Sequence, residues 1–105
     1  MMPAPGLQVS AAQFAILNAI LREHLPDGVI VWAYGSRAKG KAKPFSDLDL
    51  ALECDQPLPP GLFGALADAF DDSDLPWKVD MIDWHAATPA FRALIVADRI
   101  ALDLR

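Results

Sequence analysis

At 105 residues the chain is long enough for one domain with a single hydrophobic core. Its apolar fraction of 53% excludes a disordered protein, and its net charge of −5 argues against a general nucleic-acid binder, which would carry a basic face. The single cysteine, Cys54, excludes an internal disulfide and a thiolate zinc cluster. We expect a cytoplasmic protein with no membrane contact, because no apolar run approaches the roughly 20 residues that span a bilayer.

The chain begins with a predicted flexible leader, residues 1–9, followed by one domain over residues 10–105. Ser10 and Gln13 form a capping-box pattern at the start of a helix, which ends near the Pro-Asp-Gly turn at residues 26–28. Apolar residues recur along this helix at helical spacing.

The next run, VIVWAY at residues 29–34, has no polar alternation, which indicates a strand buried on both faces. Gly35 and Ser36 follow it directly, and residues 36–39 predict one turn of helix. From Asp47 to Glu53 apolar and polar residues alternate strictly, which predicts a half-buried strand.

The second half continues with a helix over residues 62–70, a strand over 77–82 and a helix that starts at Thr88-Pro89. A short last strand is predicted within residues 100–104. The alternation of helices and strands predicts an α/β (α+β) domain, in which a small mixed β-sheet is flanked by helices.

Two aspartates, Asp47 and Asp49, lie two residues apart on a predicted strand and therefore point the same way, with Cα atoms about 6.5 to 7 Å apart. Carboxylates so placed can converge on metal ions, as two-metal phosphoryl and nucleotidyl transfer requires, and hard oxygen ligands suit Mg²⁺. Asp80 lies in the middle of a later strand, where a lone charge is costly unless it meets a cation. The alternative is that Asp-x-Asp only makes a strand edge soluble.

The junction of Gly35 and Ser36 offers backbone N–H groups and a hydroxyl to an anion, and glycine allows close backbone approach. Four cations near the junction could screen phosphate charge: Arg37, Lys39, Lys41 and Lys43. A solvated basic loop is the alternative. The turn, the paired aspartates and Asp80, taken together in this order, favour a site that binds metal and phosphate.

Gly35-Ser36, ten intervening residues and Asp47-Leu48-Asp49 resemble the Gly-Ser-x10-Asp-x-Asp signature of the DNA polymerase beta-like nucleotidyltransferase superfamily. The longer string YGSRAKGKAKPFSDLDLAL resembles its minimal nucleotidyltransferase (MNT) branch. WKVDMIDW is similar to the strand that bears the family's third carboxylate, which corresponds to Asp80 here.

The resemblance implies a polymerase beta-like fold, two Mg²⁺ ions and transfer of AMP from ATP. It implies that the catalytic and metal-binding residues are Asp47, Asp49 and Asp80, with Asp80 also helping to deprotonate the acceptor hydroxyl. It further implies that Gly35 and Ser36 hold the terminal phosphates, with Arg37 and Lys39 as supporting candidates.

MNT proteins of this size resemble the antitoxins of HEPN/MNT toxin–antitoxin pairs, which transfer AMP to a tyrosine of the HEPN toxin. Since 105 residues leave no room for a separate acceptor domain, we expect the acceptor to be met by a partner or by this domain's own surface. Two alternatives stay open: an antitoxin that neutralises its partner by binding alone, and the catalytic subunit of a small-molecule nucleotidyltransferase, for example one that acts on an antibiotic.

Overall fold

A four-stranded mixed sheet lies at the centre of the computed structural model, which describes residues 6–104. The strands are β1 (Ile30–Tyr34), β2 (Leu48–Glu53), β3 (Val79–Asp83) and β4 (Ile100–Ala101), in the spatial order β3-β2-β1-β4. β1 pairs antiparallel with β2 and β4, whereas β2 and β3 are parallel. The predicted fold class, a small mixed sheet flanked by helices, is confirmed.

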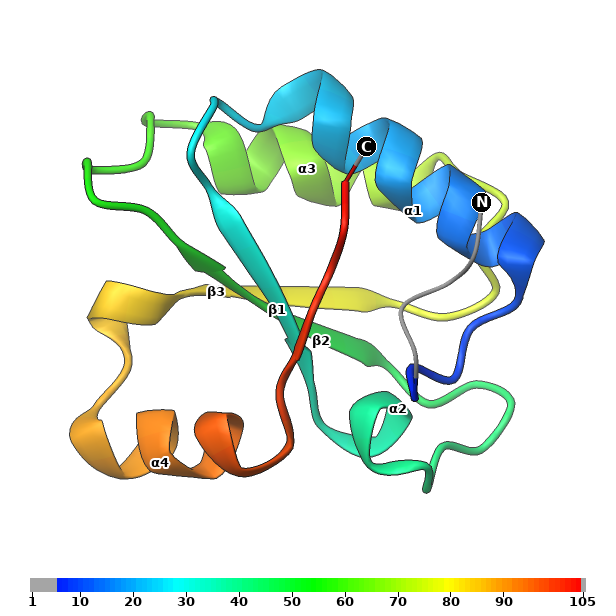
Figure 1. Ribbon diagram of the computed structural model, residues 1–105. Coiled ribbons are helices and arrows are strands. Elements are labelled where there is room, and N and C mark those ends of the chain that lie inside the picture. The colour runs from blue at the N-terminus through cyan, green and yellow to red at the C-terminus, as the bar shows by residue number, and fades with distance from the viewer. Residues whose placement is uncertain (1–5, 105) are drawn as a thin grey trace.

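Helices cover the two faces of this sheet unequally. The helices are α1 (Ala11–His24), α2 (Ser36–Lys39), α3 (Leu62–Asp71) and α4 (Pro89–Asp98), and a 3-10 turn, η1 (Trp84–Ala86), was not predicted. Figure 1 shows α1 and α3 side by side on one face of the sheet, with α4 on the opposite side. The predicted capping box of Ser10 and Gln13 and the predicted N-cap Thr88 are both formed.

The hydrophobic core lies between the sheet and the pair α1 and α3. Leu48, Leu50 and Leu52 of β2 are completely buried, which confirms the predicted apolar face of this strand. They belong to one cluster with residues of the two helices, among them Phe14, Leu17 and Leu66. The polar residues of β2 therefore project from the other face, where α4 lies.

That second face is only partly covered, so the prediction that β1 is buried on both faces is wrong. Val31 and Ala33 are buried, but Ile30 is 46% exposed, and Trp32 is only half-buried. The Arg99 guanidinium stacks on the Trp32 ring, with 3.9 Å between its carbon and the ring centroid. Large aromatic side chains on a half-open face thus produced an uninterrupted apolar run in the sequence.

The described residues that precede α1 already pack against the rest of the domain. Residues 1–5 of the predicted leader lie outside the described residues, whereas Leu7 is buried in the core and the Gln8 N–H donates to the Arg37 carbonyl oxygen over 2.9 Å. Among the described residues, no helix combines the length and apolar character needed to cross a membrane.

Candidate active site

Gly35, directly after β1, brings the backbone into contact with a carboxylate. Its φ of 78° and ψ of −160° lie in a region that only glycine adopts readily. A Cβ atom built at this position would collide with Oδ2 of Asp49 and would lie 3.2 Å from its Cγ. The chain therefore needs glycine here for both its backbone geometry and its space.

The turn at Gly35 leads straight into α2. The Gly35 carbonyl oxygen accepts from the N–H groups of Ala38 at 3.1 Å and Lys39 at 3.0 Å, which fixes the helical turn. Ser36 is half-buried at the start of this helix, where the first N–H groups have no helical carbonyl as a partner. The structure thus places Ser36 and the first N–H groups of α2 directly after the Gly35 turn that contacts Asp49.

Asp49 and Asp80 are direct neighbours across the parallel pair of β2 and β3, and Tyr34 of β1 is the antiparallel partner of Asp49. These three residues form one row across the sheet on its half-open face. Asp47 is exposed and lies one residue before β2 begins. The structure therefore brings Asp49 and Asp80 together with the Gly35 turn and places Asp47 at the edge of the group.

The electrostatic environment of this row disfavours negative charge. Burial raises the pKa of the Asp49 carboxyl, and the charges of Asp80 and Asp47 raise it further. Burial also raises the pKa of Tyr34 to about 12, with further contributions from Asp49 and Asp80. Within residues 6–104, no hydrogen bond or ion pair engages the side chains of these aspartates.

A cation bound among the carboxylates of Asp47, Asp49 and Asp80 would offset the repulsion between their negative charges. Among the described residues, no three His, Cys, Asp or Glu side chains lie so that they could hold a metal ion together, so the protein alone offers an incomplete set of ligands. The donors available are carboxylate oxygens, and a partial oxygen shell fits Mg²⁺, which usually keeps waters and takes further ligands from substrate phosphates. The residues present are therefore compatible with the predicted metal.

Arg37 does not take the predicted role of a phosphate contact. Its side chain is buried, and its guanidinium donates to the carbonyl oxygens of Gln8, Lys43, Pro44 and Ser46 over 2.8 to 3.3 Å. It also stacks on Trp77, 4.5 Å from the ring centroid. Nε and Nη2 thus hold the loop between α2 and β2, and Nη1 holds the segment before α1, so that every nitrogen of the group is used. This is a correction to the sequence-based interpretation, which could not separate a scaffolding cation from a ligand-binding one.

Lys39 projects from the end of α2 toward α4. Its Nζ lies 3.6 Å from Oδ2 of Asp98, and both side chains are partly exposed, so this pair adds little stability. A long, exposed ammonium group can leave such a pair for a phosphate, and its predicted contact with the nucleotide stays a prediction.

Tyr34 is a site residue that the sequence interpretation missed. Its ring packs edge-on against Phe91 of α4, with 5.9 Å between ring centroids, and its hydroxyl-bearing side chain stands in the row with Asp49. The sequence signal that could have identified Tyr34 is its position directly before Gly35, at the end of a strand that was expected to lead into the site.

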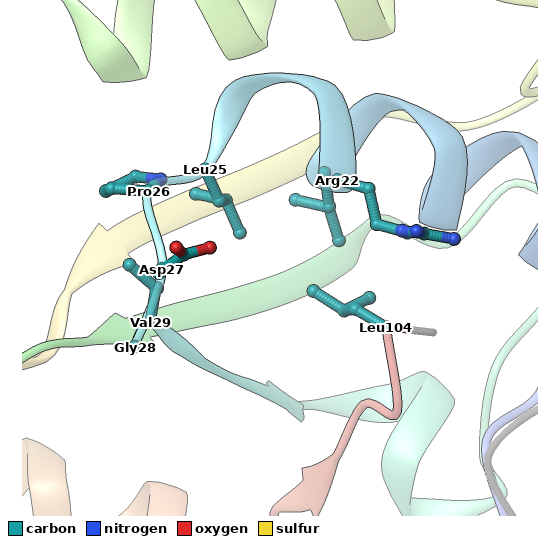
Figure 2. Close-up of a pocket in the computed structure, with 8 residues that line it drawn as sticks. Arg22, Leu25, Pro26, Asp27, Gly28, Val29 and Leu104 are labelled. Atoms are coloured by element: carbon teal, nitrogen blue, oxygen red, sulfur yellow. The ribbon is translucent and has the colours of Figure 1, made fainter.

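A hollow of about 360 Å³ elsewhere on the molecule contains none of these residues. Figure 2 shows it between the end of α1, the turn into β1 and Leu104, with Arg22 and Asp27 at its rim. It lies at the opposite end of β1 from Gly35, so we do not assign the chemistry to it.

Comparison with protein families matches residues 16–103 to the family described as polymerase beta, nucleotidyltransferase. The chain belongs to this nucleotidyltransferase family. The fold and activity class implied by the sequence resemblance are therefore confirmed.

The nucleotidyltransferase is similar to several known proteins and solved structures. It is 46% identical over 89 residues to the probable protein adenylyltransferase MntA of Haemophilus influenzae, covering 85% of this chain and 77% of that protein. A solved minimal nucleotidyltransferase is 26% identical with a TM-score of 0.63, over 86% of this chain and 88% of that one. A chain of a toxin–antitoxin crystal structure with AMP-PNP has a TM-score of 0.68 at 23% identity, over 83% of this chain and 69% of that chain. The last match shows a shared fold.

Proposed function

We propose that this nucleotidyltransferase is a protein adenylyltransferase that acts as the antitoxin of a toxin–antitoxin pair, transferring AMP from ATP to a tyrosine hydroxyl of a HEPN-type toxin in the cytoplasm. The observation that carries the proposal is the row of Asp49 and Asp80 beside the Gly35 turn, in a chain 46% identical to the probable adenylyltransferase MntA. Solved structures of the same fold include MntA–HepT toxin–antitoxin complexes, which supports a protein partner.

In this proposal, Asp47, Asp49 and Asp80 hold two Mg²⁺ ions. When bound, the metal supplies positive charge that neutralises the triphosphate and the developing charge on the leaving pyrophosphate. The raised pKa of Asp49 supports this assignment, because a carboxylate that is costly to ionise alone gains most from a cation.

The chain's own residues orient the two substrates. Gly35 and Ser36 hold the terminal phosphates through backbone N–H groups and the hydroxyl, and Lys39 leaves its exposed pair with Asp98 to support them. Asp80, exposed at the rim of the site, accepts the proton of the acceptor hydroxyl. The acceptor oxygen then bonds to the α-phosphorus, the bond from that phosphorus to the bridging oxygen breaks, and pyrophosphate leaves with the electron pair.

The test is incubation of the protein with ATP labelled at its α-phosphate, Mg²⁺ and a HEPN-type toxin from the same organism. We expect label on a tyrosine of that protein, and at least about a hundredfold slower transfer for the double variant Asp47→Asn with Asp49→Asn. Tyr34 is the one tyrosine of the enzyme, so Tyr34→Phe is the control that excludes self-labelling. Absence of label with the wild-type protein would contradict the proposal.

Neutralisation by binding alone is the second candidate, favoured by apolar side chains exposed on α4: Phe91, Leu94 and Val96. It predicts that the double Asp→Asn variant still protects cells from the toxin in a growth assay. The catalytic proposal predicts that this variant fails to protect, although it still binds the partner.

A further inference from the structure

An apolar hollow of about 470 Å³ opens next to Asp80, on the same face of the sheet as the row of carboxylates. It is lined by Ile82, Asp83, Ala86, Ala87, Thr88 and Phe91. Ile82 follows Asp80 by two residues on β3, so the two side chains share a face. Phe91 packs against Tyr34, the strand partner of Asp49. Two lining residues of the hollow thus adjoin residues of the site: Ile82 lies next to Asp80 on one face of β3, and Phe91 contacts Tyr34.

The lining offers mostly carbon surface, with two polar side chains, Asp83 and Thr88, each of which already makes one hydrogen bond to the backbone. Oδ1 of Asp83 already accepts from the His85 N–H over 3.0 Å, and Oγ1 of Thr88 accepts from the Phe91 N–H over 3.2 Å. A purine base seated here would lose water from several ring nitrogens and its amino group, and only the Asp83 carboxylate and the Thr88 hydroxyl could replace it, which is unfavourable. A phenyl ring has no such groups, so it fits these walls better.

We propose that this hollow is the acceptor subsite, in which the ring of the partner's tyrosine packs on Ile82 and Phe91 while its hydroxyl reaches Asp80. This inference rests on the proposed function. Alternate residues of a strand are about 6.5 to 7 Å apart, comparable with the length of a phenolic side chain, so a ring seated over Ile82 directs its hydroxyl toward Asp80. Leu94, 69% exposed and one helical turn after Phe91, continues the apolar surface toward the rest of the partner.

The subsite is tested by filling it. Ala86→Leu places a larger side chain in the hollow, and Ala65→Leu on α3 is the matched control, because it changes another exposed alanine on the opposite face of the sheet. We expect Ala86→Leu to raise KM for the protein acceptor about tenfold or more, while the Kd for Mg²⁺ and AMP-PNP stays within about twofold of wild type. The control should change neither value.

A binding measurement keeps this test separate from the proposed activity. The methyl resonances of Ile82, Ala86 and Ala87 are followed by NMR while N-acetyl-L-tyrosinamide or Mg²⁺ with AMP-PNP is added. We expect the tyrosine probe to shift these resonances in the wild type and in Ala65→Leu, and not to shift those of Ile82 and Ala87 in Ala86→Leu.

The possible results separate the two proposals. Shifts with the tyrosine probe but no AMP transfer would support the subsite and overturn the proposed function. The subsite itself is overturned if the nucleotide shifts these resonances and Ala86→Leu weakens nucleotide binding, because the base then occupies the hollow. It is also overturned if AMP is transferred and Ala86→Leu leaves the KM for the acceptor unchanged.

Discussion

Asp49 and Asp80 are paired in register on the two parallel strands β2 and β3, so their carboxyl groups project from the same face of the sheet. The Gly35 turn closes against Asp49 so tightly that no side chain fits between them. The site therefore holds repelling carboxylates next to a turn that is suited to phosphate. This arrangement costs stability in the free protein, and a bound cation would relieve the repulsion.

Replacing Asp49 by Asn should stabilise the free protein at neutral pH. The pKa of this carboxyl is raised by burial and by Asp80, so the folded state retains the proton more readily than the unfolded state does. Stability is therefore lost as pH rises from the ordinary aspartate pKa through the higher folded value. Thermal unfolding across this range should show Asp49→Asn with a higher Tm than wild type near pH 7 and an equal Tm at low pH. Asp27→Asn, in an exposed turn, is the control, and an equal change in both variants would contradict the assignment.

Magnesium should raise the Tm of the wild-type protein in the absence of nucleotide. An ion that binds the folded state alone stabilises it by about 2.7 kcal/mol at one hundred times its Kd. Asp49→Asn removes a negative ligand, so its Tm should rise much less at the same Mg²⁺ concentration. Calcium chloride and sodium chloride of equal ionic strength serve as controls for ion selectivity and screening. Equal increases in the two proteins would exclude Asp49 as a metal ligand.

Tyr34 should ionise at an unusually high pH, and its titration can be followed without interference from another phenol. It is the one tyrosine of the chain, and its pKa is raised to about 12 by burial, by Asp49 and by Asp80. Phenolate absorbance should therefore appear well above the ordinary tyrosine pKa of about 10, and the stability of the folded protein should fall as pH rises between these values. Asp80→Asn should lower the Tyr34 pKa, whereas Asp27→Asn should leave it unchanged. Titration of Tyr34 near its ordinary value in the folded wild type would refute this account.

Three glycine substitutions separate backbone strain from close contact. Gly28→Ala meets open space but has a φ of 85°, so we expect a loss of about 1 to 2 kcal/mol. Gly35→Ala forces a side chain into a backbone region that only glycine adopts readily and also collides with Asp49, so it should lose clearly more stability and its nucleotidyl transfer. Gly64→Ala, inside α3 with free space, should gain up to about 1 kcal/mol. Urea unfolding gives the three free energies, and similar losses for Gly28→Ala and Gly35→Ala would show that the contact with Asp49 is unimportant.

Local signals in the sequence were sufficient to predict the main helices and strands and to select most of the candidate site residues. Alternation along β2 predicted its buried leucines and the outward direction of Asp49, and Gly35 was found because a glycine after a strand permits close approach. The direct pairing of Asp49 with Asp80 could not be derived from local signals, since the register of β2 and β3 depends on the packing of the whole β2–α3–β3 unit. Arg37 shows the limit most clearly: its charge suggested a phosphate ligand, but the carbonyl oxygens it binds come from a loop whose path only the folded chain defines.

Arg37→Lys should destabilise the fold although it keeps the charge. The guanidinium binds four carbonyl oxygens and stacks on Trp77, and a lysine ammonium has neither the planar fork nor as many donors. With several carbonyl groups left without this charged donor and the contact with Trp77 reduced, we expect a loss of about 1 to 3 kcal/mol in urea unfolding. Because Ser46 directly precedes Asp47, the variant should also bind Mg²⁺ more weakly. Arg22→Lys, on the exposed side of α1, should change neither quantity, and an Arg37→Lys protein as stable as this control would show that the loop is held by other contacts.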